Sequence, residues 1–156
     1  MAAFKEVPVR GGDILIDWDV TNGRGDWFVS AGSLATAQNG YDTRKNAILL
    51  SLFTDRRAPD DLKMKDPRGW WGDTYSGRPI GSWLWLLFRT KITNRTATLQ
   101  LARKYCLDAL QWMIDDGIAQ SITASVSWAT TSILAIKIRI TGPDGTTSDY
   151  GWLWRN

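Results

Sequence analysis

The sequence predicts an α+β fold in which a C-terminal antiparallel β-meander packs against a long helix. Two observations support this prediction. Apolar residues recur with a helical period over 96–116, and from Ile122 onwards they alternate with polar residues. The sequence Gly-Pro-Asp-Gly at 142–145 is a strong turn signal within the alternating region. An N-terminal strand region, a shorter helix and a long loop rich in Trp and Gly complete the predicted fold.

The N-terminal third predicts one strand and one helix. Residues 13–20 alternate between apolar and polar side chains, the pattern of a half-buried strand. Residues 21–42 are rich in Gly, Asn and Ser and predict a long loop that could contain a hairpin around 27–29. From Asp42 to about Thr54 the apolar residues fall on one helical face, which comprises Ile48, Leu49 and Leu52.

A long segment without regular structure is predicted next, over residues 55–81, because it contains Pro59, Pro67 and Pro79. It includes the stretch DPRGWWGD at 66–73, in which two adjacent tryptophans lie between glycines. Loops of this length in compact domains are more often functional than not. The apolar run at 83–88 follows and predicts a buried helical segment with Ser82 as its N-cap.

The long helix and the three strands have clear inward faces. The helix over 96–116 ends at Gly117, and its apolar face comprises Leu99, Ala102, Cys106, Ala109, Leu110 and Met113. The inward positions of the strands are Ile122, Ala124, Val126 and Trp128, then Leu134, Ile136, Ile138 and Ile140, and finally Tyr150, Trp152 and Trp154.

Composition narrows the possible functions. We expect the 156 residues to form one domain, with its core at about 13–154. The chain has no histidine, which excludes a His-based catalytic triad, a histidine general base and an imidazole metal site within it. The net charge of +3 comes without a basic run, so no nucleic-acid partner is expected. No apolar stretch reaches membrane-spanning length, so no membrane partner is expected either.

Ten tryptophans and a set of aspartates leave a second class of function open. Paired carboxylates are what glycoside hydrolysis requires, and aromatic rings with nearby carboxylates suit sugar binding. The loop aspartates are Asp55, Asp60, Asp61, Asp66 and Asp73. Asp115 and Asp116 are adjacent at a helix end, where a capping or solvated role is the simpler interpretation. No metal-binding spacing occurs in the loop, so we expect neither a metal nor another cofactor.

Three stretches in order carry a family resemblance: SLFTDRRAPDD at 51–61, RGWWGD at 68–73 and GSWLWLLFRTK at 81–91. The helix ending ALQWMIDDGIA, followed by alternating strands, extends it. Over about 13–154 the chain resembles the small baseplate protein of Mu-like contractile-tailed phages, a family similar to the wedge or sheath-initiator proteins of contractile tails. The resemblance implies a structural, non-enzymatic virion protein that is assembled in the cytoplasm of the bacterial host.

The partners implied by the resemblance are other baseplate wedge proteins, the first ring of tail sheath subunits, and the tail tube or hub. The implied role is that of a sheath initiator, which links the wedge around the tube to the first sheath ring. Two alternatives remain: a tail domain that binds or cleaves peptidoglycan, and a tube or hub subunit. The broader sheath-initiator group often carries Glu-Pro-Arg just after the long helix, where this chain has Asp115 to Ile118, so that contact is not transferred.

Two sets of candidate interface residues follow. The loop set either contacts the wedge or clasps the domain into a contacting shape, with one of the two adjacent indoles expected to plug the core; it comprises Arg56, Arg57, Arg68, Trp70, Trp71 and Asp73. The sheet set is expected to accept a strand from a neighbouring sheath subunit and comprises Ile136, Ile138, Ile140, Trp152 and Trp154. On this basis Ile138→Pro is expected to disrupt sheath attachment.

Overall fold

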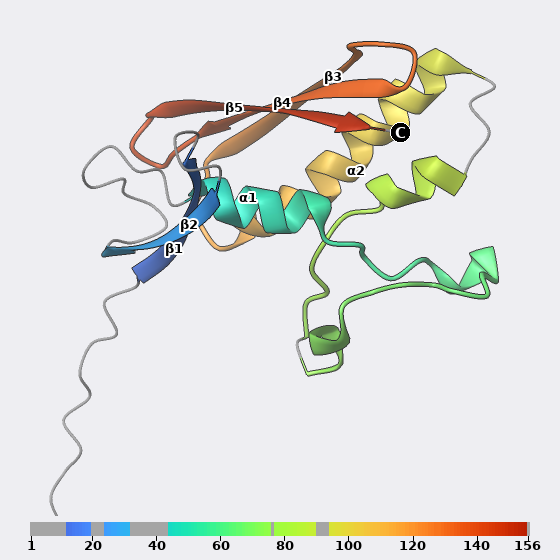
Figure 1. Ribbon diagram of the computed structural model, residues 1–156, viewed down its shortest axis with the longest axis horizontal. Coiled ribbons are helices and arrows are strands. Elements are labelled where there is room, and N and C mark those ends of the chain that lie inside the picture. The colour runs from blue at the N-terminus through green and yellow to red at the C-terminus, as the bar shows by residue number, and fades with distance from the viewer. Residues whose placement is uncertain (1–11, 20–23, 32–43, 76, 90–93, 156) are drawn as a thin grey trace, which may run out of the picture. The chain divides into compact units, whose positions relative to one another are not determined.

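The structure is a computed structural model that describes residues 12–19, 24–31, 44–75, 77–89 and 94–155. The chain divides into two compact units, Met1–Asn46 and Ala47–Asn156, which are described separately below. The elements confirm an α+β fold with a C-terminal antiparallel meander (Figure 1). That residues 1–156 form a single domain stays a prediction.

The first unit contains an antiparallel hairpin of β1 (Gly12–Asp19) and β2 (Arg24–Ala31). The strand predicted over 13–20 is confirmed up to Asp19. The hairpin that the sequence allowed around 27–29 is present, but the loop prediction for the rest of β2 is wrong, because β2 pairs along its whole length with β1. The β-forming residues Trp27, Phe28 and Val29 outweigh the turn-forming residues around them once a partner strand is available. The remainder of the predicted loop lies outside the described residues.

Helix α1 (Arg44–Phe53) confirms the shorter predicted helix, although the proposed start at Asp42 lies outside the described residues. Ile48 and Leu52 are fully buried and Leu49 is half-buried, as the predicted face requires. Leu50 and Phe53 occupy other faces of α1 and are exposed.

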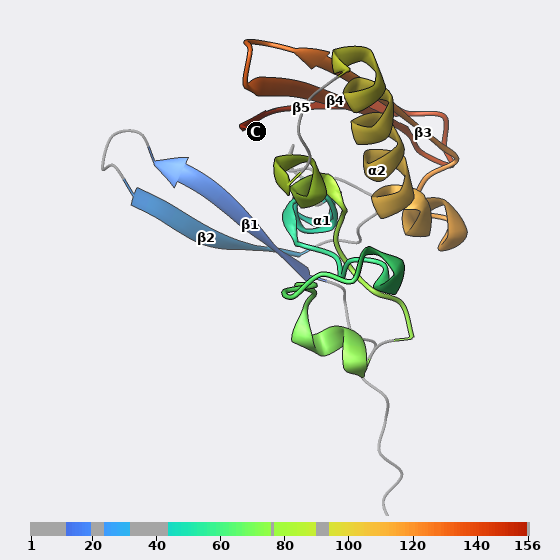
Figure 2. The same ribbon diagram turned by 90° about the vertical axis from the view of Figure 1, so that its right-hand side faces the viewer.

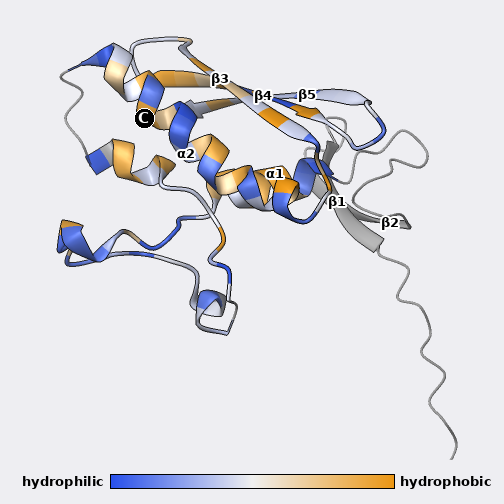
Figure 3. Ribbon diagram, turned by 180° about the vertical axis from the view of Figure 1, so that it is seen from behind, coloured by the Kyte–Doolittle hydropathy of each residue, from blue (hydrophilic) through white to orange (hydrophobic). Residues whose placement is uncertain are grey.

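In the second unit, the strands form a meander in the order β3 (Ser121–Trp128), β4 (Ile133–Thr141), β5 (Thr147–Arg155). Helix α2 (Arg95–Asp115) runs along one face of this sheet (Figures 1 and 2). Hydrophobic and hydrophilic residues alternate along α2 and the strands, and the apolar positions meet in one core (Figure 3). The largest fully buried side chains of that core include Leu110, Met113, Leu134, Ile136, Ile138 and Ile140.

Both ends of α2 have local causes. The Asn94 side chain accepts a hydrogen bond from the Ala97 N–H at 3.0 Å and so caps the first turn. At the other end Gly117 has a φ of +70°, which a residue with a Cβ rarely adopts. The Ile118 N–H then donates to the Met113 carbonyl at 2.8 Å and closes the last turn.

The apolar run predicted at 83–88 is helical, but it forms a 3-10 helix, η3 (Leu84–Arg89). A 3-10 helix repeats every three residues, so Leu84 and Leu87 share one side and join the main core. Trp85 and Leu86 lie on other sides and pack with Ala58 in a second, smaller cluster. The segment 55–81 is irregular, as predicted, apart from two short 3-10 turns, η1 (Asp60–Leu62) and η2 (Trp71–Thr74).

Across the described ranges, no helix has both the length and the apolar content that crossing a membrane requires.

Candidate protein interface

The segment between α1 and η3 is closed at its base by backbone hydrogen bonds. The Ser82 N–H donates to the Thr54 carbonyl at 2.9 Å, and the Arg56 N–H donates to the Ser82 carbonyl at 3.0 Å. The Ser82 hydroxyl donates to the carbonyl of Leu52, the last buried residue of α1. Gly81 has a φ of +94°, and a Cβ there would lie 2.4 Å from the Thr54 oxygen. Only glycine fits at this closure, which turns a long segment into a loop with a fixed base.

Two arginine–tryptophan contacts stiffen the loop above this base. The Arg56 guanidinium lies 4.8 Å from the ring centroid of Trp83, and that of Arg68 lies 4.7 Å from the ring centroid of Trp85. These are cation–π distances. Both indole N–H groups donate to loop carbonyls at 2.9 Å, Trp83 to Arg57 and Trp85 to Arg56. The buried side chain of Trp85 therefore holds two segments of the loop, one through the Arg56 carbonyl and the other through the Arg68 guanidinium.

A tight turn at 66–69 leads into the two adjacent tryptophans. Arg68 is a non-glycine residue with a φ of +54°, and its N–H donates to a side-chain oxygen of Asp66 at 3.1 Å. Its guanidinium also forms an ion pair with Asp55. Gly69 follows with a φ of +107°, and a Cβ there would approach the Arg57 Cβ to 2.9 Å. The turn is strained at Arg68, and the contacts of that side chain compensate for the strain.

The end of the loop presents aromatic rings to solvent. Trp70 is 40% exposed, Trp71 is 75% exposed and Tyr75 is 86% exposed. The ring centroids of Trp70 and Trp71 are 5.4 Å apart, and those of Trp71 and Tyr75 are 6.5 Å apart. Trp70 lies directly over Gly72, where a Cβ would come within 2.2 Å of the indole. We call Trp70, Trp71 and Tyr75 the aromatic tip.

The expectation that one indole plugs the core is wrong, because neither Trp70 nor Trp71 is buried. The residues that do plug the base of the loop are Trp83 and Trp85, which follow it in sequence. Tyr75 is an exposed member of the tip that the sequence reasoning missed. Its position four residues after Trp71, on the same short turn, was the available signal.

Five of the six predicted loop residues line one hollow of about 550 Å³; these are Arg57, Arg68, Trp70, Trp71 and Asp73. Arg56 is not among the lining residues and contacts Trp83 instead. One oxygen of Asp73 accepts a hydrogen bond from the Ile80 N–H at 3.0 Å, which ties the tip to the returning chain. The other oxygen is buried without a hydrogen-bond partner in the part of the chain that the structure describes.

Two further carboxylates, one in the loop and one at the end of α2, have local partners. Asp60 pairs with Arg57 at 3.3 Å, and Asp115 accepts a hydrogen bond from Gln111 at 3.0 Å. Within the described ranges, no three residues of the metal-ligating types cluster together. These contacts hold the loop and the end of α2 in shape.

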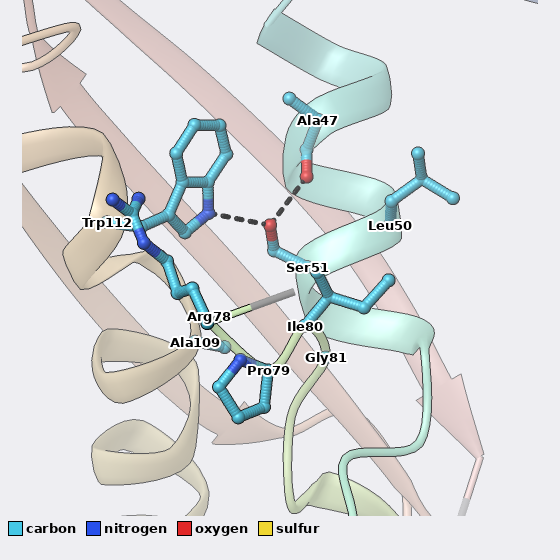
Figure 4. Close-up of a pocket in the computed structure, with 10 residues that line it drawn as sticks. Ala47, Leu50, Ser51, Arg78, Pro79, Ile80, Gly81, Ala109 and Trp112 are labelled. Atoms are coloured by element: carbon cyan, nitrogen blue, oxygen red, sulfur yellow. Dashed lines mark hydrogen bonds between the residues drawn. The ribbon is translucent and has the colours of Figure 1, made fainter. Parts of the chain in front are cut away.

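A second surface feature is an apolar groove of about 750 Å³ between α1, α2 and residues 77–81 (Figure 4). At its floor the Trp112 N–H donates to the Ser51 hydroxyl at 3.0 Å, and that hydroxyl donates to the Ala47 carbonyl at 2.7 Å. At its rim the two terminal guanidinium nitrogens of Arg78, Nη1 and Nη2, each donate to one carboxylate oxygen of Asp116 at 2.9 Å. This hydrogen bonding lowers the pKa of the Asp116 carboxyl and raises the pKa of Arg78.

The Arg78–Asp116 pair was missed from the sequence, which showed no arginine in the stretch after the long helix. The arginine comes from the loop, 38 positions earlier in the chain. Local sequence carries no signal for a pair formed between such distant segments.

The predicted sheet residues belong to β4 and β5 and contribute to the core. Ile136, Ile138 and Ile140 belong to the central strand β4 and are buried against α2. Strand β4 is paired on both sides, with β3 and with β5. Ile138→Pro would therefore disrupt the hydrogen bonding of the sheet itself and could not test sheath attachment. Trp152 and Trp154 belong to the edge strand β5 and turn half-buried side chains toward the core.

Comparison with known proteins agrees with the resemblance. The family model described as "Phage protein GP46" matches residues 44–147, which span the loop, the groove and the strands β3 and β4 of the sheet. "Baseplate protein gp46" of Escherichia phage Mu is 40% identical over 147 residues, covering 88% of this chain and 92% of that protein. "Mu-like prophage FluMu protein gp46" of Haemophilus influenzae is 39% identical over 136 residues, covering 86% and 90%. The chain belongs to the GP46 family of phage proteins, which includes this baseplate protein of phage Mu.

Proposed function

We propose that this chain is a structural protein of the baseplate of a Mu-like phage, and that it links the wedge around the tail tube to the first ring of sheath subunits. The baseplate role is supported by the name of the relative from phage Mu, which is similar over 88% of this chain. The finer role rests on two surfaces of the second unit, the aromatic tip and the edge of the sheet.

The observation that carries the proposal is an aromatic tip held on a stiff loop. Trp71 and Tyr75 are 75% and 86% exposed although the loop beneath them is fixed by Trp85, Ser82 and Gly81. Tryptophan, tyrosine and arginine dominate the energetics of protein interfaces. A preorganised tip loses little conformational entropy on binding, which suits a permanent contact in an assembly. In this proposal the tip contacts another wedge protein.

The second surface is the three-stranded sheet, where a neighbouring sheath subunit adds a strand. An edge strand presents unpaired N–H and C=O groups along its length, and added strands bind through them. The sheet lies in the same rigid core as α1 and α2, so a strand bound at its edge is fixed relative to the loop base.

The decisive experiment replaces Trp70 and Trp71 together by alanine in the phage that encodes this chain. We expect the double variant to fold and to be absent from purified baseplates, detected by immunoblotting of sedimented tails. The matched control is Leu62→Ala, which removes another exposed apolar side chain of the same loop. Normal contractile tails containing the double variant would exclude the tip from the mechanism.

The same tails separate this proposal from a tube or hub subunit, because a map of the tail gives the copy number and radial position of the chain. A peptidoglycan-directed alternative is tested with purified protein, by clearing of cell-wall suspensions and by cosedimentation with cell walls. Binding or clearing that is lost on Asp73→Asn would favour that alternative.

A further inference from the structure

Among the described residues, the three-stranded sheet has no further strand paired at β3 or at β5, and these two edges differ. The Gly142 N–H donates to the Thr146 carbonyl at 2.7 Å, which makes these two residues a hydrogen-bonded pair of the β4–β5 ladder. Paired residues of an antiparallel ladder alternate between hydrogen-bonded and non-hydrogen-bonded. Continuing the alternation, the residues of β5 that direct their N–H and C=O groups away from β4 are Thr147, Asp149, Gly151, Leu153 and Arg155.

The edge at β3 is occupied in part by α2. The Ala129 N–H donates to the Ile133 carbonyl at 2.8 Å, so the same alternation directs the backbone groups of Ala124 to the free edge of β3. The Arg103 side chain of α2 donates from Nε to that Ala124 carbonyl at 2.9 Å. A strand added at β3 would lose this acceptor or displace the arginine.

The edge at β5 carries a notch. Gly151 has no side chain, and a Cβ placed there would meet no atom closer than the Ile136 oxygen at 4.0 Å. The outer face above it is a shallow hollow of about 530 Å³, which Lys137 and Asp149 also line. Large side chains on a neighbouring strand pack over an edge glycine of this kind.

The residues on either side of the notch add two preferences. Leu153 is 72% exposed on the same outer face, so an added strand gains most there from an apolar residue. Asp149 belongs to the edge strand β5 and forms an ion pair with Arg139 of the neighbouring strand β4 at 2.7 Å. A basic residue on the added strand would continue this row of alternating charge.

We propose that β5 is the receiving edge, and that it selects an extended segment of another protein with three outward side chains in alternate positions. The segment places a basic residue opposite Asp149, a large aromatic or apolar residue opposite Gly151 and an apolar residue opposite Leu153. This inference rests on the proposed function, in which the sheath attaches by strand addition, and it names the edge and the side chains that the edge selects.

The first test fills the notch with a side chain of β5 itself. Gly151→Tyr places a large side chain over the hollow and leaves the backbone groups of β5 unchanged. Ser127→Tyr is the matched control, because Ser127 lies on the same outer face, pairs with Ala135 of β4 and is not among the residues that line the hollow. Both variants are expected to match the parent chain in thermal unfolding and in incorporation into baseplates.

Sheathed tails are then counted by electron microscopy. We expect Gly151→Tyr to lower the sheathed fraction by about tenfold or more, the change in an equilibrium constant that corresponds to losing one good interface contact. The control should stay within about twofold of the parent, as expected for a surface substitution outside the contact. Normal sheathing with Gly151→Tyr, an equal loss with Ser127→Tyr, or failure of Gly151→Tyr to enter baseplates would each overturn the inference.

A photo-crosslinking side chain in place of Leu153 in assembled tails identifies the bound segment directly. The expected product joins Leu153 to an extended segment that carries the three outward residues named above. Crosslinks to a helical segment, or to no protein in tails that are sheathed, would refute the inference and leave the baseplate role untouched. Absence of the parent chain from purified tails would refute the proposed function itself.

Discussion

Replacing Trp71 and Trp85 separately by alanine distinguishes the contact residue of the loop from its structural support. Trp71 is 75% exposed and Trp85 is 3% exposed. A tryptophan side chain buries roughly 200 Å² when fully covered, and burial contributes about 25 cal/mol per Å². Trp71→Ala should therefore lower the free energy of unfolding by only about 1 kcal/mol, whereas Trp85→Ala should lower it by about 3–5 kcal/mol.

For binding, the same calculation gives Trp71 the larger contribution, because Trp71 has more exposed surface for a partner to cover than Trp85. Covering the exposed part of Trp71 in a complex contributes at most about 4 kcal/mol, and a truncated interface anchor commonly costs about 2 kcal/mol or more. Chemical denaturation followed by circular dichroism measures the first quantity, and competition between parent and variant chains for entry into baseplates measures the second. A large stability loss for Trp71→Ala, or equal competition with the parent chain, would refute the division into contact and support.

Three further predictions concern stability and chemistry. Gly81→Ala should lower the free energy of unfolding by about 2 kcal/mol or more, because the added Cβ meets the Thr54 carbonyl at a positive φ; unchanged denaturation would contradict that geometry. The contribution of Asp116 to stability should be present above its unfolded pKa and lost as the pH falls through its lower folded pKa, because Arg78 lowers that pKa; an NMR titration of the Asp116 carboxyl should move upward in Arg78→Gln and stay unchanged in Arg139→Gln. Cys106 should resist thiol reagents at pH 8 in the folded protein and react after unfolding, because burial raises its pKa to about 12; rapid labelling of the native chain would contradict its burial.

The elements that could be predicted are those whose signal lies within a single segment. The face of α2 and the alternation of β3, β4 and β5 repeat over enough residues for the period to identify them. Strand β2 was predicted no further than a hairpin around 27–29, because Gly25 and Asp26 suggest a turn and the full strand forms only with β1 as its partner. The pair of Arg78 with Asp116 was missed for a related reason, because the two residues come from segments that only folding brings together.

The sequence predicted which residues form the candidate site, but it did not predict which of them are buried supports and which are exposed. Residue type marks arginine and tryptophan as interface residues, and five of the six predicted residues do line one hollow. Burial is a property of the folded chain, however, and it assigned the support to Trp83 and Trp85 and the exposed tip to Trp70 and Trp71. The sheet prediction named strands without identifying the edge, because alternation identifies the inner face of a strand but says nothing about which strand is at the edge.

The contacts of the arginines explain how the tip can stay exposed without losing its shape. Arg56 lies over Trp83, while Arg68 lies over Trp85 and pairs with Asp55. Each guanidinium therefore covers an aromatic face at the base, and in doing so it becomes less available to a partner. Arg57 differs, because its side chain is 61% exposed and its ion pair with Asp60 is fully at the surface. Of the three arginines, Arg57 is the one that a partner carboxylate can recruit at little cost to the fold.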